Sequence, residues 1–83
     1  MNISVIGTGY VGLTTAVCLA AKGHKIYCVD VDGERIESIK KGKPIIYEKG
    51  LEKLLQEVLA KGNLIPTMDL KEAFDNSDVS FIW

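Results

Sequence analysis

Short apolar runs alternate along this chain with longer segments of helical periodicity. Four runs have the length and character of strands, at Ile3–Ile6, Lys25–Asp30, Leu64–Thr67 and Val79–Trp83. Between them, apolar residues recur at helical spacing in Val11–Lys22, Glu34–Lys41, Leu51–Lys61 and a short segment that begins at Asp69. Strands that alternate with helices are typical of an α/β protein with a parallel sheet. The pattern therefore predicts one small α/β domain.

The first predicted strand runs directly into a glycine-rich turn, Gly7-Thr8-Gly9-Tyr10-Val11-Gly12. In a G-x-G-x-x-G turn the first glycine permits a tight bend, and the second lets the backbone approach a pyrophosphate. The third lets the next helix pack closely on the sheet. The free N–H groups and the positive dipole end of that helix favour a bound diphosphate. We therefore predict a dinucleotide site at Gly7, Gly9 and Gly12.

An acidic residue, Asp30, ends the second predicted strand at the place that the dinucleotide fingerprint requires. Its carboxylate can accept hydrogen bonds from the adenosine ribose and would repel a 2′-phosphate, which favours NAD over NADP. Arg35 follows closely enough to reach the adenosine end of the cofactor, although it fits a solvated helix surface equally well. Pro66 suits an edge strand. Together these features predict the first half of a doubly wound, Rossmann-like sheet with strand order 3-2-1-4.

Composition favours no other class of protein. The chain has 83 residues, 47% hydrophobic and 25% charged, with a formal net charge of −1. This balance is ordinary for a globular domain and predicts neither nucleic acid nor a membrane as a partner. Cys18, Cys28 and the single histidine lack the spacing of a metal site, so no metal is predicted. We expect both cysteines to be buried, in a reducing cytoplasm.

The last predicted strand, Val79–Trp83, belongs beside the first strand, at an interior position of a doubly wound sheet. As the final element of this sequence it would leave a bare apolar edge. We therefore expect residues 1–83 to be the amino-terminal part of an NAD-binding Rossmann domain. On this interpretation the remainder of that domain and a substrate domain are absent.

These residues resemble the amino terminus of the UDP-glucose/GDP-mannose dehydrogenase family. The resemblance rests on three segments, Val5–Leu13, Cys28–Asp32 and Ile46–Leu51, and extends over essentially the whole chain. Its Gly-Tyr-Val-Gly-Leu core is considerably more specific than the bare glycine pattern. Two positions depart from the family, because Lys49 replaces its usual proline and Trp83 replaces a small residue.

The resemblance implies a two-step, four-electron oxidation in which two NAD are reduced while the carbon-six alcohol of a nucleotide sugar becomes a carboxylate. The family's catalytic cysteine and its assisting residues lie beyond residue 83, so this chain is expected to hold no catalytic residue and to be inactive alone. Carried over by position, the cofactor-binding residues are Gly7, Gly9, Gly12, the main-chain N–H groups of Tyr10 and Val11, Asp30 for the ribose, and Arg35 beside it. Glu48 would lie on the nicotinamide or substrate side. The resemblance also implies a cytoplasmic homodimer or higher homo-oligomer.

Two other classes of NAD-binding protein share the glycine turn and the acidic residue after the second strand. Another NAD-dependent hydroxyacid or hydroxyacyl dehydrogenase would not need the Gly-Tyr-Val-Gly-Leu or Tyr-Glu-x-Gly-Leu segments. A non-catalytic NAD-sensing regulatory domain, of the kind that controls potassium transport, would lack the insertion Pro44–Gly62. A shared fold does not by itself decide among these functions.

Overall fold

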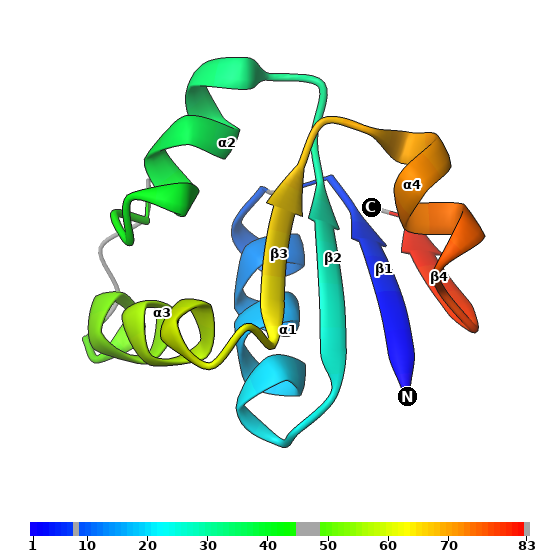
Figure 1. Ribbon diagram of the computed structural model, residues 1–83. Helices are drawn as coiled ribbons and strands as arrows, with labels where there is room; N and C mark the ends of the chain where they lie inside the picture. Colours follow the sequence, from blue (N-terminus) through cyan, green and yellow to red (C-terminus); the bar gives the residue numbers. More distant parts are fainter. Residues whose placement is uncertain (8, 45–48, 83) are drawn as a thin grey trace.

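The computed structural model describes residues 1–7, 9–44 and 49–82 (Figure 1). In chain order its elements are β1 (Asn2–Ile6), α1 (Tyr10–Ala21), β2 (Lys25–Val29), α2 (Gly33–Lys40), α3 (Leu51–Ala60), β3 (Leu64–Thr67), α4 (Leu70–Asp75) and β4 (Val79–Ile82). Each predicted strand and helix is present, and its ends differ from the prediction by at most one residue among the described positions.

The strands form one parallel sheet in the order β3-β2-β1-β4. This order confirms the predicted α/β, Rossmann-like arrangement. Pro66 lies in β3, at the edge of the sheet as predicted, where its missing N–H does not interrupt a ladder. The register aligns the last residues of neighbouring strands, since Ile6 is opposite Val29 and Val29 is opposite Thr67. The carboxyl ends of β1, β2 and β3 therefore meet at one edge.

Helices cover both faces of the sheet, as Figure 1 shows. Because side chains alternate along a strand, Ile26 and Cys28 face one helix layer while Tyr27 and Val29 face the other. The larger cluster lies under α1, α2 and α3 and contains Ile3, Val5, Leu13, Ala16, Val17, Ala20, Ile26, Cys28, Ile39, Leu51, Leu55, Val58 and Leu64. The smaller cluster lies under α4, where Ala73 packs with Tyr27 and Val29. The core is thus concentrated on the side of α1.

Helix α1 is built from small and apolar residues, which lets it pack directly on the central strands. Gly12, in its first turn, is buried, as expected for the third glycine of the fingerprint. The helix ends before Gly23, whose φ of 101° is left-handed and therefore suits glycine. A glycine after the last helical turn predicts such an end, and the chain returns at once into β2.

Helix α4 differs from the prediction in the residues that it buries. Helical spacing in the segment that begins at Asp69 predicts that Leu70, Ala73 and Phe74 point inward. Ala73 is buried, but Leu70 and Phe74 are 43% and 46% exposed. The helix is held against β1 by a polar contact instead, because Ser4 Oγ donates to the carbonyl oxygen of Ala73 at 3.1 Å. Asp69 caps the helix as predicted, since its carboxylate accepts from the Glu72 N–H at 3.0 Å.

The two cysteines have different environments. Cys28 is fully buried in β2, and this burial, together with the nearby carboxylate of Asp30, raises the pKa of its thiol from 9.0 to about 12. It therefore stays protonated and inert at neutral pH. Cys18 was also expected to be buried, but it is exposed on α1. The helix is apolar almost all round, so its sequence does not distinguish the face that packs from the face that does not.

Candidate cofactor site

The glycine turn begins with a strained backbone position at the end of β1. Gly7 has a φ of 96°, in the left-handed region that favours glycine. Its N–H donates to the carbonyl oxygen of Val29 at 2.7 Å, which ties the turn to the end of β2. The tight bend predicted at Gly7 is therefore present and is fixed to the neighbouring strand.

Gly9 has a different reason to be glycine. Its backbone is extended, with a φ of −67°, and a Cβ built at this position would meet no atom of the described residues within 4 Å other than those of its chain neighbours. Neither strain nor crowding inside the protein thus requires a glycine. The open space stands at the start of a helix, where the close approach of a pyrophosphate to the backbone would need it.

The start of α1 is open to an anion. Gly9 is its N-cap and no side chain caps it, and its first turn contains no acidic residue. Tyr10 and Val11 begin the helix, so their N–H groups are among those that no helical carbonyl can satisfy. The positive end of the helix dipole adds to their attraction for negative charge. These groups fit the diphosphate of a dinucleotide.

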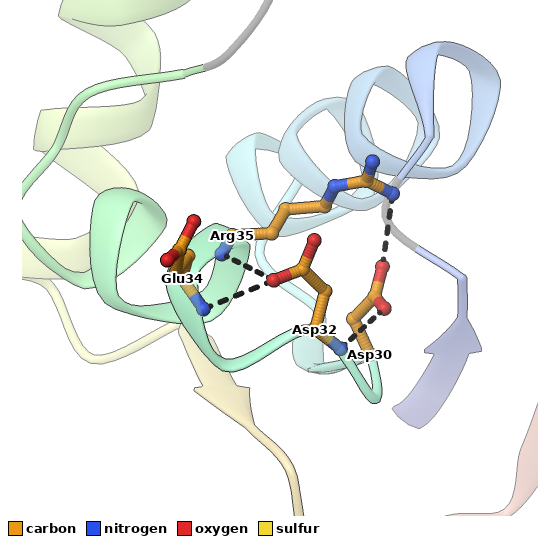
Figure 2. A network of polar contacts seen from close by, with 4 residues as sticks. All are labelled: Asp30, Asp32, Glu34 and Arg35. Carbon is orange, nitrogen blue, oxygen red and sulfur yellow. Dashed lines mark hydrogen bonds and ion pairs between the residues drawn. The ribbon is translucent and has the colours of Figure 1, made fainter.

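Asp30 emerges from the end of β2 at the same edge of the sheet, and its carboxylate is oriented by its neighbours (Figure 2). Its Oδ1 accepts from the backbone N–H of Asp32 at 2.9 Å, and its Oδ2 pairs with Nη1 of Arg35 at 3.3 Å. The Asp30 side chain is only 9% exposed, whereas that of Arg35 is 35% exposed. The carboxylate is thus buried beside a more exposed guanidinium.

A local capping motif explains why Arg35 reaches Asp30. The Asp32 carboxylate accepts from the N–H groups of Glu34 and Arg35, at 3.0 and 3.3 Å, and so begins α2 directly after β2. Arg35 then lies in the first turn of α2, with its side chain extended toward Asp30 in Figure 2. The structure thus places the Arg35 side chain beside Asp30 while leaving it 35% exposed, and its contact with a cofactor stays a prediction.

A cavity of about 170 Å³ lies at this edge of the sheet and brings together residues from three loops. It is lined by Ile6, Gly7, Val29, Asp30, Val31, Met68 and Leu70. The sequence predicts Gly7 and Asp30 at this site but not the apolar wall formed by Met68 and Leu70. These two residues follow β3 directly and are 55% and 43% exposed. Their position just after a strand of a parallel sheet was the signal that could have identified them.

Glu48 lies outside the described residues. In the part of the chain that the structure describes, no group of three or more His, Cys, Asp or Glu could hold a metal ion. Within the same ranges, no helix is long and apolar enough to cross a membrane.

Comparison with known proteins identifies the family. The NAD binding domain of the UDP-glucose/GDP-mannose dehydrogenase family matches residues 1–83. Over 82 residues the chain is 50% identical to GDP-mannose 6-dehydrogenase of Pseudomonas aeruginosa and 49% identical to UDP-glucose 6-dehydrogenase of Rhizobium meliloti. Each alignment covers 99% of this chain but only 19% of the relative.

Solved structures of dehydrogenases match the fold of this chain. A ternary complex of GDP-mannose dehydrogenase from Pseudomonas aeruginosa matches all of this chain, and 19% of its own, with a TM-score of 0.97 and 49% identity. A UDP-glucose dehydrogenase from Pyrobaculum islandicum matches 96% of this chain, and 18% of its own, with a TM-score of 0.91 and 40% identity. The chain therefore belongs to the UDP-glucose/GDP-mannose dehydrogenase family and lies in its NAD-binding domain.

Proposed function

We propose that this chain holds the adenosine half of NAD within a nucleotide-sugar 6-dehydrogenase. One observation carries the proposal: an uncapped helix start and a buried, oriented carboxylate stand at the same edge of the sheet, with a cavity beside them. A dinucleotide has this sequence of chemical groups, with a diphosphate next to a ribose diol and an apolar base. The helix start suits the diphosphate, the carboxylate suits the ribose diol, and the apolar cavity suits the base.

Different predicted residues are proposed to contact the pyrophosphate, the ribose and the adenine of the cofactor. The pyrophosphate lies against the glycine turn and accepts from the N–H groups at the start of α1. These residues are Gly7, Gly9, Tyr10, Val11 and Gly12. The ribose hydroxyls donate to Asp30, which Arg35 orients from the other side, and the adenine enters the cavity between Val31, Met68 and Leu70. The apolar walls exclude water from the base, and the buried carboxylate selects the diol.

The proposed reaction of the whole protein is the oxidation of a primary alcohol at carbon six of a nucleotide sugar to a carboxylate. NAD would supply the hydride acceptor for each of the two oxidation steps, and one water would supply the second carboxylate oxygen. The residues of this chain bind and orient the cofactor, and we assign none of them to the reacting carbon. Relatives named for GDP-mannose and for UDP-glucose match about equally well, at 50% and 49% identity, so the proposal stays at the class of nucleotide sugar.

The chain spans about a fifth of the length of these relatives, since the alignments cover 19% of each. We accordingly propose that residues 1–83 are the amino-terminal part of the cofactor domain and do not turn over substrate alone. A cytoplasmic location is supported by two free thiols. A homo-oligomer is the proposed assembly. Family membership favours the nucleotide-sugar enzyme over the hydroxyacid dehydrogenase and the NAD-sensing domain.

The test is a titration of the isotope-labelled chain with ADP-ribose, NAD and NADP, followed by amide chemical shifts. We expect saturable shifts at the start of α1 and around Asp30 with ADP-ribose and NAD, and much weaker binding of NADP because the carboxylate repels its 2′-phosphate. Amide shifts detect weak binding, which matters because the proposed site contacts only the adenosine half of the cofactor. A folded chain that shows no saturable shifts would contradict the proposed half-site.

A further inference from the structure

We infer that Arg35 is a phosphate-binding cation held neutralised by Asp30, so that the preference for NAD depends on the charge of Asp30 rather than on the lack of a cation for NADP. This inference rests on the proposed function, because it requires the adenosine ribose to lie at Asp30. It adds a second specificity-determining residue to that site and predicts which residue would bind a 2′-phosphate.

The guanidinium of Arg35 is more exposed than the carboxylate of Asp30 with which it pairs. Nη1 of Arg35 lies 3.3 Å from Oδ2 of Asp30, and the guanidinium is 35% exposed while the carboxylate is 9% exposed. A guanidinium has five N–H donors in a fixed fork, and the contact with Asp30 is made through Nη1. Donors therefore remain for a second anion that approaches from solvent.

Backbone hydrogen bonds hold Arg35 in place independently of its ion pair with Asp30. The Asp32 carboxylate accepts from the Arg35 N–H at 3.3 Å and from the Glu34 N–H at 3.0 Å. These bonds fix the first turn of α2 from its own N-cap. Removal of the Asp30 charge would thus leave the Arg35 backbone where it is and release its guanidinium.

The charge that a 2′-phosphate would meet at this site depends on whether Asp30 is ionised. With Asp30 ionised, a 2′-phosphate would meet a poorly solvated negative charge next to Arg35. With Asp30 neutral, the same phosphate would meet an unpaired guanidinium, which binds phosphate through charge-assisted, often bidentate hydrogen bonds. Asp32 and Glu34 are also acidic and close, but both are exposed, so solvent and salt screen their charges. The buried carboxylate is therefore the dominant repulsion.

The experiment compares three variants with the unmodified chain: Asp30→Asn, Arg35→Gln and the double variant Asp30→Asn/Arg35→Gln. Each is titrated with NAD and NADP at low salt, with amide shifts as the readout and circular dichroism as a check of folding. We expect Asp30→Asn to bind NADP more tightly than the unmodified chain by on the order of tenfold, the scale of one charged hydrogen bond. The double variant should lose this gain. Arg35→Gln alone should not improve NADP binding.

Two outcomes would overturn the inference while leaving NAD binding to the unmodified chain intact. In one, Asp30→Asn binds NADP as weakly as the unmodified chain, so Arg35 does not reach the phosphate. In the other, the single and double variants gain NADP affinity equally, so only repulsion was relieved. If the folded, unmodified chain binds neither NAD nor ADP-ribose, the proposed function fails as well, and the inference fails with it.

Discussion

At the scale of single residues, the two leading glycines of the turn have different physical reasons to be glycine. Gly7 needs its freedom for the fold, because its φ is 96°. Gly9 has an ordinary backbone, and no described atom beyond its chain neighbours lies near the position of its missing side chain, so we propose that a ligand is the reason for a glycine there. We therefore expect substitution of Gly7 to affect the stability of the fold and substitution of Gly9 to affect the binding of the ligand.

Gly9→Ala should therefore leave the free energy of unfolding nearly unchanged but weaken the binding of ADP-ribose strongly, because the new methyl group occupies the pyrophosphate position. Gly7→Ala should instead destabilise the fold by about 1–2 kcal/mol, the cost of a left-handed residue with a side chain. Urea denaturation measures the first quantity and amide-shift titration the second. Equal loss of stability in both variants would contradict the assignment of Gly9 to the ligand.

At the scale of elements, the start of α2 couples helix formation to the site. Asp32 caps the helix through two backbone N–H groups, and its own N–H donates to Asp30. One residue thus orders the first turn of α2, the side chain of Arg35 and the carboxylate of Asp30. By contrast, no described side chain caps α1, and its first N–H groups have no helical carbonyl as acceptor.

Asp32→Ala should lower the free energy of unfolding by about 1 kcal/mol, as the loss of an N-cap typically does. It should also weaken NAD binding, because Arg35 and Asp30 lose their alignment. Asp32→Ser is the matched control, since a serine hydroxyl can still accept from the first-turn N–H groups. Both losses should be largely restored in the serine variant. An alanine variant with weakened stability but unchanged NAD affinity would show that the cap does not order the site.

At the scale of the whole molecule, the two faces of the sheet contribute unequally to stability. The face under α1, α2 and α3 holds most of the buried apolar side chains, including Leu55, which has no exposed surface. The opposite face is covered by the short helix α4, where Phe74 is 46% exposed. Val79 and Phe81 of β4, at 39% and 43% exposure, are also incompletely covered. Most of the folding free energy is therefore expected to come from one layer.

Leu55→Ala should cost about 2–5 kcal/mol, because it leaves a cavity in the main core. This is a large part of the roughly 5–15 kcal/mol that a small domain possesses. Phe74→Ala removes a larger side chain from an incompletely buried position and should cost much less. Thermal and urea unfolding of both variants checks the order. A greater loss for Phe74→Ala would mean that the α4 face carries more of the stability than its burial indicates.

The amino-acid sequence by itself determined the order of elements, the parallel sheet and the glycine turn that leads into α1. These features depend on local causes: the periodicity of apolar side chains, the left-handed backbone at Gly7 and Gly23, and the carboxylate cap at Asp32. The position of Asp30 after an apolar strand could likewise be predicted from the sequence. Such signals extend over a few neighbouring residues, so they can be read without knowledge of the rest of the chain.

The tertiary structure decided which apolar side chains are covered and which residues share the site. Cys18 and Phe74 are exposed because burial depends on which face of a helix meets another element, and helical spacing alone does not specify that partner. Met68 joins Asp30 in one cavity because the parallel register brings the ends of β2 and β3 to the same edge. Contacts between residues so far apart in the chain exist only once the sheet has assembled, so neither segment specifies them by itself.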